Sequence, residues 1–256
     1  MVLLFALITG MSIWEYTGLI NEVEDVQINR FINTVAGVYF FFAVAGVCMG
    51  IVGNAVFIPY LLTIVYILLS ELFLKAKNPI INQAYSALGQ MYIAVPLSMI
   101  CVLAFNPSQD GTPIFNNTVP LSVFIFLWLN DTGAYCCGSI FGKHKLFERV
   151  SPKKTWEGTI GGVVLAVVVG AVIGAITVSD GEGDKLTSAL VFAGLAMVVA
   201  VFGTLGDLVE SLFKRTIGVK DSGNILPGHG GMLDRFDSSL LAIPAAVIYF
   251  YTLSVL

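Results

Sequence analysis

The chain has 256 residues, of which 57% are hydrophobic and only 12% are charged. Soluble domains carry about 25% charged residues, so this composition excludes an ordinary soluble protein and predicts repeated membrane crossing. The formal net charge of −4 gives no indication of nucleic-acid binding. The cysteines at positions 48, 101, 136 and 137 lie in apolar segments without a C-x-x-C pair. We interpret them as small core residues.

Eight apolar segments are long enough for a bilayer-spanning helix, which needs about 20 residues. They lie at 2–20, 34–53, 54–73, 84–105, 118–142, 158–178, 186–213 and 238–256. We therefore predict an all-α fold, a polytopic membrane helix bundle with about eight transmembrane helices. The first segment lacks a basic flank and a small-residue cleavage site, so we do not interpret it as a signal peptide.

The cations are distributed asymmetrically over the connecting loops. If the segments alternate in direction, the loops at 21–33, 74–83, 143–157 and 214–237 share one side and hold twelve of the thirteen Lys and Arg residues. Only Lys185 lies on the other side. Because cytoplasmic loops are enriched in cations, we expect these four loops to be cytoplasmic and both termini to lie outside.

The fifth segment contains an acidic residue, Asp131, well inside an apolar run. Such a residue usually faces a polar cavity and is functional. A structural hydrogen bond to a neighbouring helix is the alternative interpretation.

The loop after this segment is basic and ends in Ser151-Pro152-Lys153-Lys154-Thr155-Trp156-Glu157. Ser151 can cap a helix that has Pro152 at its first position, and basic side chains beside that helix end would form an anion site. The alternative is an ordinary cytoplasmic loop. Trp156 could stack on a nucleobase or act as an interfacial anchor.

Small residues recur every fourth position in the sixth segment, at Gly158, Gly162, Ala166, Gly170 and Gly174. This ladder permits close helix packing, either within the chain or across a homodimer.

Residues 204–238 form the most polar stretch of the chain. Asp207, Glu210, Ser211 and Lys214 are spaced to share one helix face. Three carboxylates follow in or beside a loop broken by Gly and Pro, at positions 221, 234 and 237, and the stretch also holds four cations. Carboxylates suit Mg²⁺ and cations suit phosphate, so these residue types indicate phosphoryl transfer. A solvated loop with internal ion pairs is the alternative.

The stretch carries a longer pattern. It reads Ser211-x-Phe213-Lys214-Arg215-x4-Lys220-Asp221-x-Gly223-x2-Leu226-Pro227-x-His229-Gly230-Gly231-x-Leu233-Asp234-Arg235-x-Asp237. This resembles the signature of the phosphatidate cytidylyltransferases, also called CDP-diacylglycerol synthases, with no departure at a charged position. Asp131-x-x-Ala134-Tyr135 and the Ser151–Glu157 block resemble two further elements of that family. The resemblance covers residues 120–240 well.

The resemblance implies transfer of a cytidylyl group from CTP to phosphatidate, giving CDP-diacylglycerol and pyrophosphate at the cytoplasmic face of a bacterial cytoplasmic membrane. It implies Mg²⁺ as cofactor and leaves a second cation and a homodimer open; the partners are CTP, phosphatidate and the lipid bilayer, and no nucleic acid. Residues 1–105 would be N-terminal transmembrane helices, and 106–256 a C-terminal transmembrane catalytic region with cytoplasmic loops 143–157 and 214–237.

The candidate residues fall into three groups. Candidate metal ligands are Asp221, Asp234 and Asp237, with Asp207 and Asp131 as weaker ones. Candidate catalytic residues are Lys214, Arg215, Lys220, His229 and Arg235, although His229 could be only a loop residue between glycines. Candidate substrate-binding residues are Ser151, Lys153, Lys154, Thr155, Trp156, Glu157, Ser211, Gly230 and Gly231.

Two other functions are compatible with parts of this sequence. A CTP-dependent polyprenol or lipid kinase would use similar nucleotide and lipid surfaces. A transporter would suit an intramembrane Asp131, but no second copy of the 204–238 stretch is found, as an internal repeat would require. In the resembled family a further hydrophobic helix precedes the one ending near Trp14-Glu15-Tyr16. Either this protein has lost that helix, or the first Met here is a downstream one. We favour the second, and we expect the chain to expose an apolar face where the preceding helix would pack.

Overall fold

The structure is a computed structural model, and it describes residues 1–107, 112–178, 184–223 and 230–255. Within these residues eight helical spans are long and apolar enough to cross a membrane. This confirms the predicted all-α membrane bundle and identifies an integral membrane protein. The chain forms two compact units, of residues 1–116 with 213–236 and residues 117–212 with 237–256. The predicted functional division at residue 105 stays a prediction.

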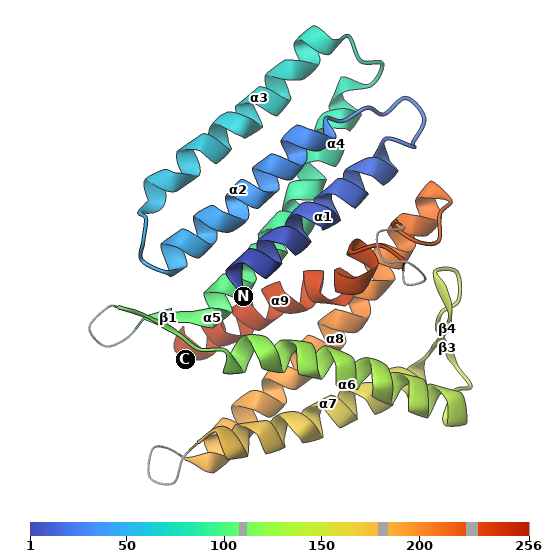
Figure 1. Ribbon diagram of the computed structural model, residues 1–256. Helices are drawn as coiled ribbons and strands as arrows, with labels where there is room; N and C mark the ends of the chain where they lie inside the picture. The colour runs from blue at the N-terminus through green and yellow to red at the C-terminus, as the bar shows by residue number, and fades with distance from the viewer. Residues whose placement is uncertain (108–111, 179–183, 224–229, 256) are drawn as a thin grey trace. The chain divides into compact units, whose positions relative to one another are not determined.

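The first unit begins with a helical bundle (Figure 1). Its helices are α1 (Val2–Ile20), α2 (Arg30–Cys48), α3 (Ile58–Leu74), α4 (Pro79–Gly89) and α5 (Val95–Ala104), with a 3₁₀ turn at Asn54–Phe57 before α3. A short antiparallel pair follows, of β1 (Phe105–Pro107) and β2 (Pro113–Phe115). Apolar side chains of α1 and α5, including Ile13, Leu97 and Ile100, are fully buried in this unit.

A π-helical turn, Gln90–Ala94, joins α4 to α5 into one membrane span. Pro96 follows at the start of α5. Because proline has no backbone N–H to donate, it interrupts the hydrogen-bond pattern of a regular α-helix. The wider turn accommodates this interruption. It also directs the buried Gln90 toward α2, where its side-chain nitrogen donates to the carbonyl of Asn33 at 2.9 Å.

The second unit consists mainly of α6 (Thr118–Phe141), α7 (Trp156–Thr177), α8 (Lys185–Ile217) and α9 (Leu233–Val255). The ends of α8 and α9 that carry residues 213–217 and 233–236 belong to the first unit. Between α6 and α7 lies an antiparallel hairpin of β3 (Lys145–Phe147) and β4 (Ser151–Thr155). Helices α6 and α7 lie side by side along most of their length (Figure 1).

The small-residue ladder of α7 packs inside the chain. All five of its positions are buried. A Cβ at Gly162 would lie 2.8 Å from the Asn130 Oδ1 atom of α6, and one at Gly170 would lie 2.7 Å from the Ala196 Cβ of α8. The glycines therefore allow the backbone of α7 to approach two neighbouring helices. Of the two interpretations that the sequence allowed, packing within the chain or across a homodimer, the structure shows the first.

The predicted helix start at Ser151 was wrong. Residues Ser151–Thr155 form strand β4, and α7 begins at Trp156. Thr155 is the N-cap, and its side-chain oxygen accepts a hydrogen bond from Gly158 N at 3.2 Å. Pairing with β3 keeps Ser151 and Pro152 extended, so the capping role passes to the next hydroxyl residue along the chain.

Candidate functional site

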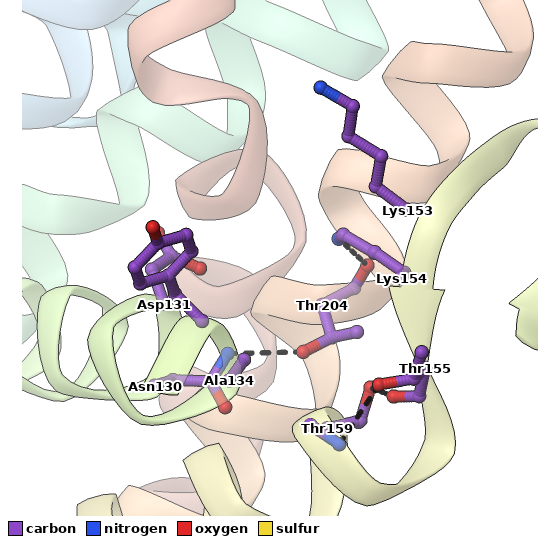
Figure 2. Close-up of a pocket in the computed structure, with 10 residues that line it drawn as sticks. Asn130, Asp131, Ala134, Lys153, Lys154, Thr155, Thr159 and Thr204 are labelled. Atoms are coloured by element: carbon purple, nitrogen blue, oxygen red, sulfur yellow. Dashed lines mark hydrogen bonds between the residues drawn. The ribbon is translucent and has the colours of Figure 1, made fainter. Parts of the chain in front are cut away.

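A cavity of about 200 Å³ lies in the second unit. Figure 2 shows several of the residues that line it, with Asn130 and Asp131 from α6, Lys153 and Lys154 from β4, and Thr204 from α8. The first turn of α7 also contributes, through Gly158 and Thr159. The cavity thus combines two lysines with the positive end of a helix, which together favour an anion.

Lys154 is held on one side of the cavity by an acidic partner. Its Nζ atom lies 2.5 Å from Asp207 Oδ2, and both side chains are partly exposed, at 25% and 30%. Ser211, one turn later on α8, donates to Asp207 Oδ1 at 3.1 Å. The sequence-predicted shared face of Asp207 and Ser211 therefore exists, and it orients Asp207 toward the β4 lysine.

A buried hydrogen bond fixes the wall between α6 and α8. The Asn130 side-chain nitrogen donates to Thr204 Oγ1 at 3.1 Å (Figure 2). Thr204 in turn donates to the Ala200 carbonyl at 3.0 Å. Asn130 is 2% exposed. The polar pair holds Asp131, the next residue on α6, at the edge of the cavity.

Glu157 binds the start of the hairpin. Its carboxylate accepts hydrogen bonds from the backbone nitrogens of Lys143 and His144 at 3.2 Å and contacts His144 Nδ1 at 2.5 Å. Trp156 N donates in turn to the His144 carbonyl at 3.0 Å. In the structure these contacts close the hairpin that carries Lys153 and Lys154.

The first unit contains a separate cluster around Asp234. Asp234 Oδ1 lies 2.7 Å from the Lys214 Nζ atom, and the two side chains are only 13% and 12% exposed. Asp234 Oδ2 accepts hydrogen bonds from the backbone nitrogens of Ser222 and Gly231, each at 2.8 Å. Both carboxylate oxygens of Asp234 therefore have donors within the protein.

Two glycines permit this arrangement. Gly230 has a φ of +80°, a conformation that side chains disfavour, and a Cβ there would lie 2.7 Å from Asp234 Oδ2. Gly231 brings its N–H directly to the same carboxylate. The two glycines predicted as substrate-binding residues thus have contacts to Asp234 in the structure.

Most of the other candidate side chains are exposed. Asp131, Lys153, Trp156, Arg215, Lys220, Asp221 and Arg235 are exposed, and Ser151 is half-buried at the start of β4. Arg215 donates to the Val219 carbonyl at 3.4 Å. His229 lies outside the described residues. Asp237 belongs to the second unit and Asp221 and Asp234 to the first, so the predicted three-carboxylate site stays a prediction.

Four residues with site contacts escaped the sequence analysis: Glu15, Asn130, Thr204 and Ser222. Glu15 offered a signal, because an acidic residue inside an apolar helix is a functional candidate by default. Asn130 is likewise a polar residue inside an apolar segment, directly before Asp131, and could have been recognised in the same way. Thr204 and Ser222 are small hydroxyl residues with no distinguishing pattern, and only their tertiary contacts identify them.

Eight apolar spans, with one ion-paired polar cluster in each unit, define a polytopic membrane protein that carries polar sites among its helices. The model of the Cytidylyltransferase family matches residues 1–253, and the chain belongs to this family.

The similarity to individual relatives is strongest over part of the chain. A protein of Staphylococcus aureus (strain COL) named phosphatidate cytidylyltransferase is 48% identical over 124 residues, 48% of this chain and 45% of the relative. Proteins of the same name from Staphylococcus haemolyticus and Staphylococcus epidermidis are each 38% identical over 172 residues, 67% of this chain and 58% of theirs. The chain therefore spans about half the length of the curated relatives it matches.

Proposed function

We propose that this protein is a phosphatidate cytidylyltransferase, which converts CTP and phosphatidate to CDP-diacylglycerol and pyrophosphate. The match of residues 1–253 to the Cytidylyltransferase family carries the proposal. The names of the relatives supply the lipid substrate. A lipid substrate accounts for a site among membrane helices, and a triphosphate accounts for the lysines at their ends.

In the proposed reaction a phosphate oxygen of phosphatidate attacks the α-phosphorus of CTP. A new P–O bond forms, the bond from the α-phosphorus to the bridging oxygen of the β-phosphate breaks, and pyrophosphate leaves with that electron pair. The attacking phosphate is already ionised near neutral pH, so a strong general base is unnecessary. The protein then contributes mainly orientation and charge neutralisation.

The cavity of the second unit supplies groups for this task. Lys153, Lys154 and the first turn of α7 line it together, and they would bind phosphate oxygens. The ion pair with Asp207 holds the Lys154 ammonium at the cavity before substrate arrives. In the first unit, Arg215, Lys220 and Arg235 are exposed cations that we propose contact substrate phosphates.

We further propose that the reaction depends on a divalent cation, Mg²⁺, which would neutralise the triphosphate. No group of three or more His, Cys, Asp or Glu side chains that could hold a metal occurs among the described residues. Asp234 is occupied by three donors and Asp207 by Lys154. The described residues of each unit alone therefore do not assemble a magnesium site, and no step above depends on one.

We propose that the active-site loops are cytoplasmic and that the host membrane is the bacterial cytoplasmic membrane. In the first unit an ion pair of 2.5 Å between Lys77 and Asp25 joins two of the cation-bearing loops at one end of the bundle. An impermeant thiol reagent added to intact cells should label a Lys185→Cys variant and spare a Lys220→Cys variant. Labelling of Lys220→Cys before lysis would contradict the orientation.

The activity is tested with purified protein, labelled CTP, phosphatidate and Mg²⁺. We expect a labelled CDP-lipid and one pyrophosphate for each CTP consumed. Release of CDP with a newly phosphorylated lipid would instead indicate a lipid kinase, and no CTP consumption would refute both activities.

A further inference from the structure

Glu15 is a buried carboxylate near the end of α1, and it is only 5% exposed. Its Oε1 atom accepts a hydrogen bond from Met232 N at 2.8 Å, and its Oε2 atom accepts one from Leu233 N at 2.8 Å and one from Ser222 Oγ at 3.3 Å. None of these partners is a charged side chain. Burying a carboxylate is costly unless donors compensate for lost water, so this arrangement indicates a specific contact.

Two of the three donors belong to the start of α9. Leu233 is the first residue of that helix and Met232 precedes it, so both nitrogens lack partners within the helix. A carboxylate at this position satisfies them and also interacts favourably with the positive end of the helix. Glu15 therefore caps α9 from a helix more than 200 residues earlier in the chain.

The backbone around Glu15 is shaped to admit the carboxylate. A Cβ at Gly223 would lie 3.0 Å from Glu15 Oε1, and a Cβ at Gly231 would lie 2.5 Å from Glu15 Oε2. Any larger residue at either position would displace the carboxylate or the loop. These glycines thus give Glu15 access to both described ends of the loop between α8 and α9.

The segments that Glu15 holds are the same ones that hold Asp234. Ser222 Oγ donates to Glu15 and accepts a hydrogen bond from Asp234 N at 3.3 Å, while Ser222 N donates to the Asp234 carboxylate. Asp234 in turn pairs with Lys214. Asp221 directly precedes Ser222, and Arg235 directly follows Asp234. The contacts that hold Ser222 and Asp234 therefore also hold the backbone of these two neighbours.

We propose that Glu15 is a positioning residue of the active site, which locks Ser222 and the start of α9 so that Asp221, Lys214 and Arg235 are correctly placed. Its role rests on the proposed cytidylyltransferase activity. Because Glu15 is only 5% exposed and its carboxylate is bonded to these segments, we assign it a role through them rather than through contact with substrate.

The principal test is the isosteric variant Glu15→Gln. An amide keeps the volume but loses the charge and turns one acceptor into a donor that faces another donor. We expect kcat to fall roughly 10- to 100-fold, the scale of one charge-assisted hydrogen bond, with KM for CTP changed less than kcat. Hydrogen exchange at the backbone nitrogens of Met232 and Leu233 should accelerate by a similar factor.

Glu71→Gln is the matched control. Glu71 is also a carboxylate on a membrane helix of the first unit, and its described contact is a hydrogen bond of 3.1 Å from the Asn82 side chain. We expect turnover and exchange at Met232 and Leu233 to stay within about twofold of the wild type. If Glu71→Gln lowers kcat as much as Glu15→Gln does, a general effect of charge removal explains the result and the proposal is overturned.

The exchange measurement needs no substrate, so it separates this proposal from the proposed function. If the wild type makes no CDP-lipid, the function fails, while faster exchange in Glu15→Gln still supports the lock. Unchanged exchange and unchanged kcat in Glu15→Gln would overturn the positioning role. Should Glu15→Gln not fold, Ser222→Ala removes one of the three contacts and should give a smaller acceleration at the same two nitrogens; no acceleration would overturn the proposal.

Discussion

The ion pair of Lys214 and Asp234 allows a quantitative prediction for Asp234→Asn. The amide retains one acceptor oxygen, so it can face either Lys214 or the two backbone nitrogens of Ser222 and Gly231, but not both. Both charged side chains are nearly buried, at 12% and 13% exposure. Breaking a buried pair by removing one partner costs about 3 to 5 kcal/mol, and we take about 3 kcal/mol for this partly solvated site.

A loss of about 3 kcal/mol corresponds to a roughly 100-fold increase in the open population of the loop ends. Hydrogen exchange at Ser222 N and Gly231 N should therefore accelerate by about that factor. Asp25→Asn is the matched control, because its pair with Lys77 is exposed and contributes little. Exchange within about threefold of the wild type at both nitrogens would refute the reasoning. The double variant Lys214→Met with Asp234→Asn should recover part of the loss, since the ammonium group that faced the Asp234 carboxylate is removed together with that charge.

Three further predictions concern the cavity, the metal and the helix packing. Asp221→Asn and Asp237→Asn should each lower turnover at least about 100-fold while the protein still inserts and purifies, and wild-type-like turnover of both at saturating Mg²⁺ would eliminate the metal-ligand role that the sequence predicts for them. Lys154→Ala should raise the KM for substrate roughly tenfold, whereas Lys185→Ala should leave it unchanged; equal KM values in the two variants would contradict phosphate binding in the cavity. Gly162→Ala should destabilise the protein by about 1 to 3 kcal/mol, because its Cβ would meet Asn130, and thermal unfolding in detergent should show this loss. Gly53→Ala is its control, since no atom lies within 4 Å of a Cβ there.

The membrane spans were predictable because hydrophobic length is a local property of the sequence. The eight expected segments agree with the observed spans, although α2 begins at Arg30, four residues earlier than predicted, and α8 continues to Ile217. Helix ends depend on caps and on partners from elsewhere in the chain. Asn29 caps α2 by accepting a hydrogen bond from Ile32 N, and hydropathy alone does not detect this contact.

The site was only partly predictable for a related reason. Residue types indicated Lys154, Asp207, Lys214 and Asp234 as candidate phosphate-binding or metal-ligating groups, and these roles stay predictions. Their actual partners could not be deduced, because each pair joins segments that are distant in sequence. The start of α7 was misplaced because Ser151 and Thr155 both have capping side chains, and strand pairing decided between them.

The distance in sequence between Glu15 and its partners has a consequence for biosynthesis. Its three partners lie 207 to 218 residues further along the chain. At a synthesis rate of about 5 to 20 residues per second, α1 emerges roughly 10 to 45 s before the start of α9 exists. During that interval the backbone nitrogens that Glu15 binds in the finished structure do not yet exist. Ser222, Lys214 and Asp234 can therefore reach the arrangement seen in the structure only once the start of α9 has been made, so the order of synthesis delays assembly of this cluster.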